Sequence, residues 1–185
     1  GWSLVKTNGT TKGIIVDYIE LQTVLTQLGE RLPPASRLTL IGGSALMLLG
    51  SPRLTVDIDF VGDDVNPNEL HRQIIQIARE LKFQIEPVPI ERFIPLPKGS
   101  EERAISIAQF GNLNIYIADP YSIALSKVDR GLDSDLEDLV FLIQHDHINL
   151  KQLEIFVQNA ISQARKFDLH PDILAHLQEL KSRLK

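Results

Sequence analysis

A Gly-Gly-Ser turn followed by a strand with two aspartates is the feature that most constrains how this chain folds. The turn spans Gly42–Ser44, and the strand after it places Asp57 and Asp59 one residue apart, between apolar neighbours. Side chains on a strand alternate between its faces, so both aspartates project from one face. Two carboxylates this close raise each other's pKa unless a cation lies between them. Magnesium binds through one or two carboxylates and substrate phosphates, so the pair predicts a metal site.

The turn adds a phosphate-binding element to this prediction. A Gly-Ser turn that opens a short apolar helix presents backbone N–H groups to an anion. Such a turn beside metal-binding carboxylates indicates nucleotide chemistry. The plainer interpretation is a hairpin or a strand-to-helix turn, followed by a strand with two hydrated acids.

Residues 42–60, which read GGSALMLLGSPRLTVDIDF, resemble the signature of the DNA polymerase β-like nucleotidyltransferase superfamily. They are most similar to a bacterial branch of small proteins related to the abortive-infection type IV toxins. The resemblance implies that Asp57 and Asp59 are catalytic and bind Mg²⁺ or Mn²⁺. Arg53 would neutralise developing charge, or pair with Asp57 structurally. The residues implied to bind a nucleoside triphosphate are Gly42, Gly43, Ser44, Arg53 and Lys127.

A second unusual segment, residues 124–139, mixes basic and acidic side chains. Judged by residue types, it is a solvated helix end in which Asp135 favours the helix dipole. The toxin-related branch instead carries a lysine on a helix after the sheet and an acid in a downstream Asp-Leu element. By this resemblance Lys127 contacts the triphosphate as a point charge. Asp135 assists the acceptor or orients Lys127, and it is preferred to Asp138 because it aligns with the Asp-Leu element.

The sequence departs from the superfamily at the third carboxylate that usually completes a two-metal site. The candidate strand carries Asn114 where an acid is expected, and its only acid, Asp119, stands at its end. We interpret Asp119 as a helix N-cap. Glu86, on an earlier strand, is the other candidate acid. The departure puts the second metal and catalytic competence in question.

Composition limits the classes of protein to which this chain can belong. The chain has 185 residues, 43% of them hydrophobic, a net charge of −5 and no cysteine. This length and apolar content suffice to bury a core. The acidic balance argues against tight nonspecific binding to long nucleic acid. The sequence lacks cysteine, an apolar run of transmembrane length and a signal-peptide pattern, so we expect a cytoplasmic protein that binds no membrane.

Periodicity predicts an α+β chain, with a small mixed sheet and flanking helices over residues 1–119 and a helical bundle over 120–185. Helices are expected over residues 14–29, 44–49 and 66–81. Strands are expected over residues 37–41, 56–61, 83–88, 105–110 and 113–117, with a loop over 90–103. The expected starts of the later helices are Asp119-Pro120, a capping box from Ser134 to Glu137, Asn149 and Pro171.

Two weaker motifs receive structural interpretations. The pair His145 and His147 lies where a helix is expected to end, so we favour an interaction with the helix dipole over a metal site. The segment Lys98–Ser100 lacks the flanking glycine and strand of a phosphate-binding loop.

Three hypotheses for function follow. The first is a metal-dependent nucleotidyltransferase that moves a nucleotidyl group to an acceptor, with RNA, a protein side chain and a small molecule all open. The second is a catalytically inactive module on the same fold that binds a nucleotide or a protein. The third is the toxin of a toxin–antitoxin pair, held inactive by an antitoxin protein; it rests on family analogy.

Overall fold

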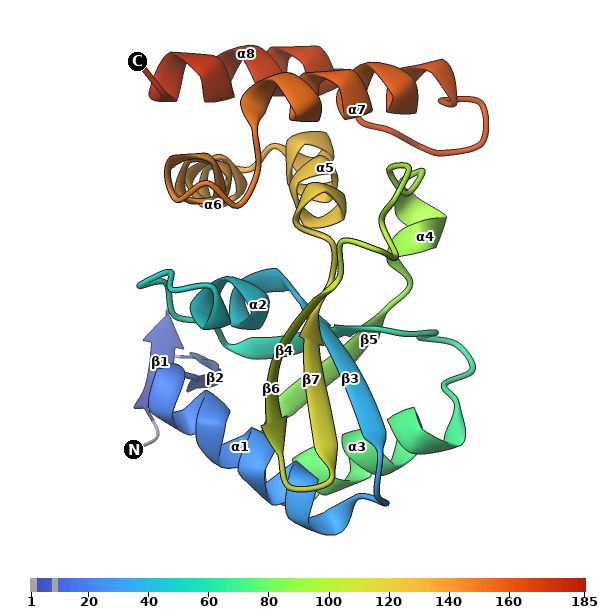
Figure 1. The fold of residues 1–185 in the computed structure, drawn as a ribbon. Helices are drawn as coiled ribbons and strands as arrows, with labels where there is room; N and C mark the ends of the chain where they lie inside the picture. The colour runs from blue at the N-terminus through green and yellow to red at the C-terminus, as the bar shows by residue number, and fades with distance from the viewer. Residues whose placement is uncertain (1–2, 8–9) are drawn as a thin grey trace. The chain divides into compact units, whose positions relative to one another are not determined.

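A five-stranded mixed β-sheet forms the centre of the first part of the chain in this computed structural model (Figure 1). The structure describes residues 3–7 and 10–185, with side chains from residue 15 onward. The strand order is β5-β4-β3-β7-β6, with parallel β3–β7 and β4–β5 pairs and antiparallel β3–β4 and β6–β7 pairs. The strands are β3 (Ser36–Ile41), β4 (Asp57–Val61), β5 (Gln84–Val88), β6 (Ile105–Phe110) and β7 (Leu113–Ile117). A separate antiparallel hairpin is formed by β1 (Ser3–Thr7) and β2 (Thr10–Ile15).

The two faces of the sheet differ in chemistry. One face is buried and apolar, and α1 (Tyr18–Arg31) and α3 (Glu69–Glu80) contact the sheet strands and each other. Its fully buried side chains include Leu38, Leu40, Ile58, Phe60, Leu113, Ile115 and Ile117. The strand register places polar residues on the other face, which we call the polar face. They are Arg37, Thr39, Asp57, Asp59, Gln84, Glu86, Ser106, Gln109, Asn114 and Tyr116.

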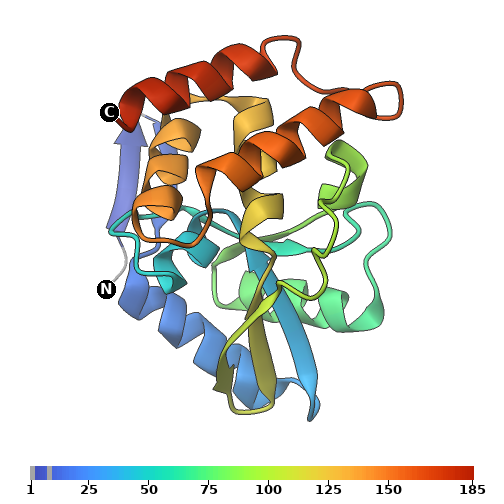
Figure 2. The same ribbon diagram turned by 45° about the horizontal axis from the view of Figure 1, so that its top comes forward.

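The chain divides into two compact units. The first runs to Pro89 and adds Ile105–Ile117, and the second contains Ile90–Ala104 and Ala118–Lys185. The segment between β5 and β6, with the short helix α4 (Ile90–Phe93), therefore belongs to the helical unit. In that unit α5 contacts the three later helices (Figure 2). The helices are α5 (Pro120–Arg130), α6 (Asp133–Gln144), α7 (Leu150–Ser162) and α8 (Ile173–Arg183).

The structure confirms the α+β class and several local predictions. The strands over residues 105–110 and 113–117 have the predicted bounds. Asp119 is the N-cap of α5, as predicted. The helix ends at Gly131, whose left-handed backbone conformation is typical of a glycine at a helix C-terminus. Asn149 caps α7 and accepts the N–H of Gln152.

The predicted helix over residues 14–29 begins too early. Residues 14 and 15 belong to β2, and the side chain of Ile14, placed on the predicted apolar stripe, lies outside the described side chains. The helix starts at Tyr18, because Asp17 and Glu20 form a reciprocal capping box. Val16 makes an antiparallel bridge with Thr55 that keeps the preceding chain extended.

Other predicted helix starts were wrong by a few residues. Asn68, and not Asn66, caps α3 by accepting the N–H of His71. No Ser134 capping box opens α6 among the described contacts; Asp135 accepts the N–H of Leu132, and the helix starts at Asp133. The last helix starts at Ile173 and not at Pro171. The loop predicted over 90–103 contains the one-turn helix α4.

Candidate functional site

The Gly-Gly-Ser turn packs directly on the strand that carries the aspartates. Ile41 at the end of β3 pairs with Asp59 on β4, and the chain then turns into the short helix α2 (Gly42–Leu48). Gly42 has φ +69°, and a Cβ there would lie 2.8 Å from Oδ2 of Asp59. The left-handed backbone favours glycine at this position, and a Cβ would displace the Asp59 carboxylate that approaches it.

The second glycine of the turn is required by packing. A Cβ on Gly43 would lie 2.8 Å from Oγ1 of Thr55 and 3.8 Å from Nε of Arg53. The Thr55 hydroxyl donates to the carbonyl of Asp57 at 2.8 Å, so it links the turn to the start of β4. The predicted nucleotide-binding residues Gly43 and Arg53 thus lie together beside the acid strand.

Ser44 lies inside the fold. Its side chain is fully buried, and its hydroxyl donates to the carbonyl of Ile41 at 3.3 Å. In this arrangement the hydroxyl stabilises the turn itself. A phosphate at the turn would therefore meet backbone N–H groups before the Ser44 side chain.

Asp57 and Asp59 are both partly exposed and share the polar face, as the one-residue spacing predicts. On the neighbouring strand β5, Gln84 is the register partner of Asp57, and Glu86 is the partner of Asp59. Within residues 15–185, no three histidine or acidic side chains are grouped closely enough to hold a metal ion. Two carboxylates on one strand fit Mg²⁺ bound jointly by protein and substrate phosphates, because that ion rarely uses an all-protein cage.

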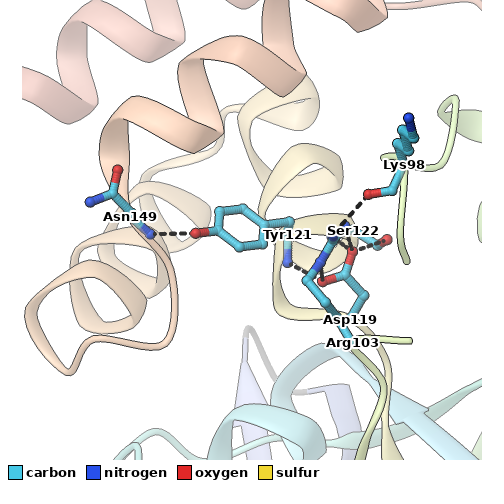
Figure 3. Close-up of polar contacts among 6 residues, drawn as sticks. All are labelled: Lys98, Arg103, Asp119, Tyr121, Ser122 and Asn149. Carbon is cyan, nitrogen blue, oxygen red and sulfur yellow. Dashed lines mark hydrogen bonds and ion pairs between the residues drawn. The ribbon is translucent and has the colours of Figure 1, made fainter. Parts of the chain in front are cut away.

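The acid at the end of the β7 segment has a structural role (Figure 3). The side chain of Asp119 is 1% exposed and accepts two N–H bonds from Arg103, each 2.8 Å long. It also accepts the backbone N–H groups of Tyr121 and Ser122 and the Ser122 hydroxyl. Asn114, which stands where an acid was expected, donates its side-chain N–H to the carbonyl of Ser36.

Sequence reasoning missed Arg103. Its guanidinium lies over the rings of Tyr121 and Phe156 and donates to the Lys98 carbonyl at 2.7 Å. Residues 90–104 are thereby bound to the start of α5 within the helical unit (Figure 3). Nothing in the sequence of residues 90–104, which also contains Arg92 and Lys98, distinguishes Arg103 from the other basic residues.

Lys127 and Asp135 come together in a buried ion-pair cluster inside the helical unit. The Lys127 ammonium lies 2.8 Å from Asp138 and 3.6 Å from Asp135. Arg130 donates two N–H bonds to Asp135, at 2.6 and 2.7 Å. The side chain of Asp135 is 0% exposed, and Lys127 and Asp138 are almost as buried. The expectation of a solvated helix end was therefore wrong for these three residues, although the exposed Arg130 side chain fits it.

The surroundings of Asp135 shift its pKa. Burial of the carboxyl acts to raise the pKa, but the hydrogen bonds and charge of Arg130 oppose it, together with the charge of Lys127 and the Leu132 N–H. The net effect places the pKa of Asp135 below its ordinary value. The ionised form is thus favoured in the folded protein.

The fold and the site define a nucleotidyltransferase-like α+β protein: a mixed sheet in which a Gly-Gly-Ser turn packs on a strand with two aspartates. The chain belongs to the DUF6036 family, described as a nucleotidyltransferase of unknown function, whose model matches residues 17–178. Neither a curated protein nor a solved structure matches the chain. Family membership supports a general nucleotidyl-transfer role with a nucleotide substrate. Among the helices described, none has the length and apolar content needed to cross a membrane.

Proposed function

We propose that this protein is a metal-dependent nucleotidyltransferase of the DNA polymerase β-like type, with its donor site on the polar face at the Gly-Gly-Ser turn. The observation that carries the proposal is the packing of the Asp59 carboxylate on the Gly42 backbone. Asp57 stands on the same face, and no described residue donates a hydrogen bond to its carboxylate. This supports a donor site in which two carboxylates suited to a metal ion lie beside a backbone turn suited to phosphate.

Each residue near the turn has a distinct task in this proposal. Asp57 and Asp59 hold Mg²⁺ or Mn²⁺, which when bound neutralises charge on the phosphates of a nucleoside triphosphate. The backbone of Gly42, Gly43 and Ser44 receives a phosphate, and Arg53 beside Gly43 supplies positive charge. An acceptor hydroxyl oxygen then bonds to the α-phosphorus as the bond to pyrophosphate breaks, and the hydroxyl proton is lost to water.

Calorimetric titration with each nucleoside triphosphate in Mg²⁺ tests the proposal directly. We expect Asp57→Asn and Asp59→Asn to weaken Mg²⁺-dependent binding at least tenfold and to abolish transfer, while the melting temperature changes little because both carboxylates are partly exposed. Glu30→Gln, an exposed acid on α1, is the matched control and should bind normally. Unchanged nucleotide binding and turnover in the Asp57 and Asp59 variants would overturn the metal mechanism.

The triphosphate contact that the resemblance assigns to Lys127 stays a prediction, as does the acceptor or orienting role of Asp135. Within the helical unit the Lys127 ammonium is already paired with Asp138 and lies near Asp135. A contact with phosphate requires Lys127 to leave Asp138. Lys127→Ala should then weaken triphosphate binding more than Lys127→Arg, which keeps the charge but differs in shape. Equal binding by both variants and the wild type would exclude the contact.

A toxin role, with an antitoxin protein as partner and RNA as acceptor, is supported by the resemblance to the abortive-infection type IV toxins. Induced expression in a bacterium should then arrest growth, and Asp57→Asn should relieve the arrest. Growth arrest that persists in the Asp57 variant would separate toxicity from nucleotidyl transfer and contradict this role.

The second candidate is a catalytically inactive module that binds a nucleotide or a protein. It is favoured by Asn114 in place of a strand acid, and by the use of Asp119 as an N-cap and partner of Arg103. Mg²⁺-dependent nucleotide binding without pyrophosphate release, across protein, RNA and small-molecule acceptors, would support this candidate over the enzyme.

A further inference from the structure

The polar face of the sheet carries a stacked arginine–tyrosine pair. The Arg37 guanidinium lies over the ring of Tyr116, 3.7 Å from its centroid. The two residues are diagonal neighbours, because Arg37 on β3 pairs with Asn114 and Tyr116 on β7 pairs with Thr39. Their contact confirms that both side chains project from the same face.

The guanidinium is held by the ring and not by an acid. Arg37 is exposed, and across residues 15–185 its side chain has no carboxylate or hydrogen-bond partner. Its N–H donors and its outer planar surface therefore remain accessible to a ligand. An arginine held on an aromatic ring loses less conformational freedom when it then binds a planar group.

The stack and the acid pair lie on the same face of the sheet, within the span of a nucleotide. Thr39, the partner of Tyr116, precedes Ile41, the partner of Asp59, by two residues on β3. Two residues correspond to about 7 Å along a strand, and β4 and β7, on either side of β3, lie about 10 Å apart, so Tyr116 is about 12 Å from Asp59 across this face. A single nucleotide with its phosphates at the acid pair can therefore extend along this face toward Tyr116 and Arg37.

We propose that Arg37 and Tyr116 receive the nucleobase of the donor nucleotide whose phosphates bind at Asp57 and Asp59. This rests on the proposed function. A nucleobase is a planar aromatic ring with polar edges, and such rings stack on arginine guanidinium planes and accept their N–H donors. A nucleic-acid strand fits this face poorly, because the charged residues on it are Arg37 and the three acids Asp57, Asp59 and Glu86.

Two probes separate a base contact from a phosphate contact: a nucleoside triphosphate, and inorganic tripolyphosphate, which has no base. Both are titrated calorimetrically in Mg²⁺. We expect the wild type to bind the nucleotide more tightly than tripolyphosphate. Arg37→Ala should weaken nucleotide binding about tenfold, as expected for loss of one base stack, and leave tripolyphosphate binding unchanged.

Paired variants distinguish stacking from charge. Arg37→Lys keeps the charge but loses the planar group, so it should lose nucleotide affinity as Arg37→Ala does. Tyr116→Phe should bind normally and Tyr116→Leu should not. Arg79→Ala is the matched control, because Arg79 is an exposed arginine on α3, which packs on the opposite side of the sheet. Melting curves verify that every variant is folded.

The outcomes that overturn the proposal differ from those that overturn the enzyme. Equal wild-type affinity for both probes, or normal nucleotide binding by Arg37→Lys, would overturn the base site while the metal site stands. So would an effect of Arg37→Ala on a short oligoribonucleotide but not on the nucleotide. Absence of wild-type binding to either probe, or Asp57→Asn binding both normally, would overturn the proposed function itself.

Discussion

The Asp59 carboxylate and the Gly42 backbone are in direct contact, so that a Cβ at position 42 would lie 2.8 Å from Oδ2. Gly42→Ala would place a side chain in a left-handed backbone conformation and push Asp59 aside. We expect a loss of about 1–3 kcal/mol in unfolding free energy and a loss of Mg²⁺-dependent nucleotide binding. Urea denaturation and calorimetry measure the two effects.

Gly50→Ala is a matched control for this substitution. Gly50 also has a positive φ, +102°, but a Cβ there meets nothing within 4 Å. It should reduce stability through backbone strain and leave nucleotide binding unchanged. If Gly42→Ala binds nucleotide as well as Gly50→Ala, the contact with Asp59 has no part in the site.

Local patterns were enough to predict much of the sheet and some helix ends. The β6–β7 hairpin alternates with period two around Gly111, and Asp119 and Asn149 are short polar residues at helix starts. Predicted starts failed where two capping residues compete, as Asn66 and Asn68 do, since both are equally good caps in isolation.

Contacts between distant segments were not accessible from the sequence. The spacing of Asp57 and Asp59 fixes their shared face, but the approach of Gly42 to Asp59 depends on the β3–β4 register. Lys127 and Asp138 stand eleven residues apart on different helices, and only the turn between α5 and α6 brings them to 2.8 Å. Because Lys127 and Asp138 are both buried, they form an ion pair inside the helical unit.

Arg103 should stabilise the helical unit through its contacts with Asp119. Arg103→Ala leaves a nearly buried carboxylate without its cation, so we expect a loss of about 3 kcal/mol in unfolding free energy. Limited proteolysis should become faster within residues 90–104. Arg103→Lys should recover part of the loss, because it keeps the charge without the two-bond geometry.

Lys98→Ala is the control for Arg103, because Lys98 contacts the guanidinium through its backbone carbonyl and not through its side chain. It should match the wild type in stability and cleavage rate. An Arg103→Ala protein that melts and is cleaved like Lys98→Ala would show that the contact carries no stability.

Asp135 should make stability sensitive to acid. Its pKa is below the ordinary value of 3.8 in the folded protein, so its contribution is complete above that pH and is lost as pH falls toward the folded pKa. Asp135→Asn should cost about 3 kcal/mol at pH 7, because it leaves Lys127 and Arg130 with less negative charge.

Urea unfolding between pH 6 and pH 3 checks this prediction. The difference in stability between wild type and Asp135→Asn should shrink below about pH 4. Asp133→Asn, an exposed neighbour on the same helix, should show a far smaller effect. A difference that stays constant with pH would mean that folding does not lower the pKa of Asp135.

His71 should produce a separate dependence on pH. Its ring contacts Phe60 edge to face at 4.8 Å, and its Nδ1 is buried without a described hydrogen-bond partner. Burial lowers the pKa of His71 below 6.5 in the folded protein, so the neutral ring is favoured. Its contribution to stability is complete above about pH 6.5 and is lost as pH falls toward the folded pKa.

His71→Phe, which does not titrate and is similar in volume, should cost under about 1.5 kcal/mol at pH 8. Below pH 6.5 the variant should lose less stability than the wild type in urea unfolding. His145→Gln, which removes an exposed histidine, is the matched control for the loss of a histidine. Parallel stability profiles for the wild type and His71→Phe from pH 8 to pH 5 would contradict this prediction, because they would mean that the pKa of His71 is the same in the folded and unfolded states.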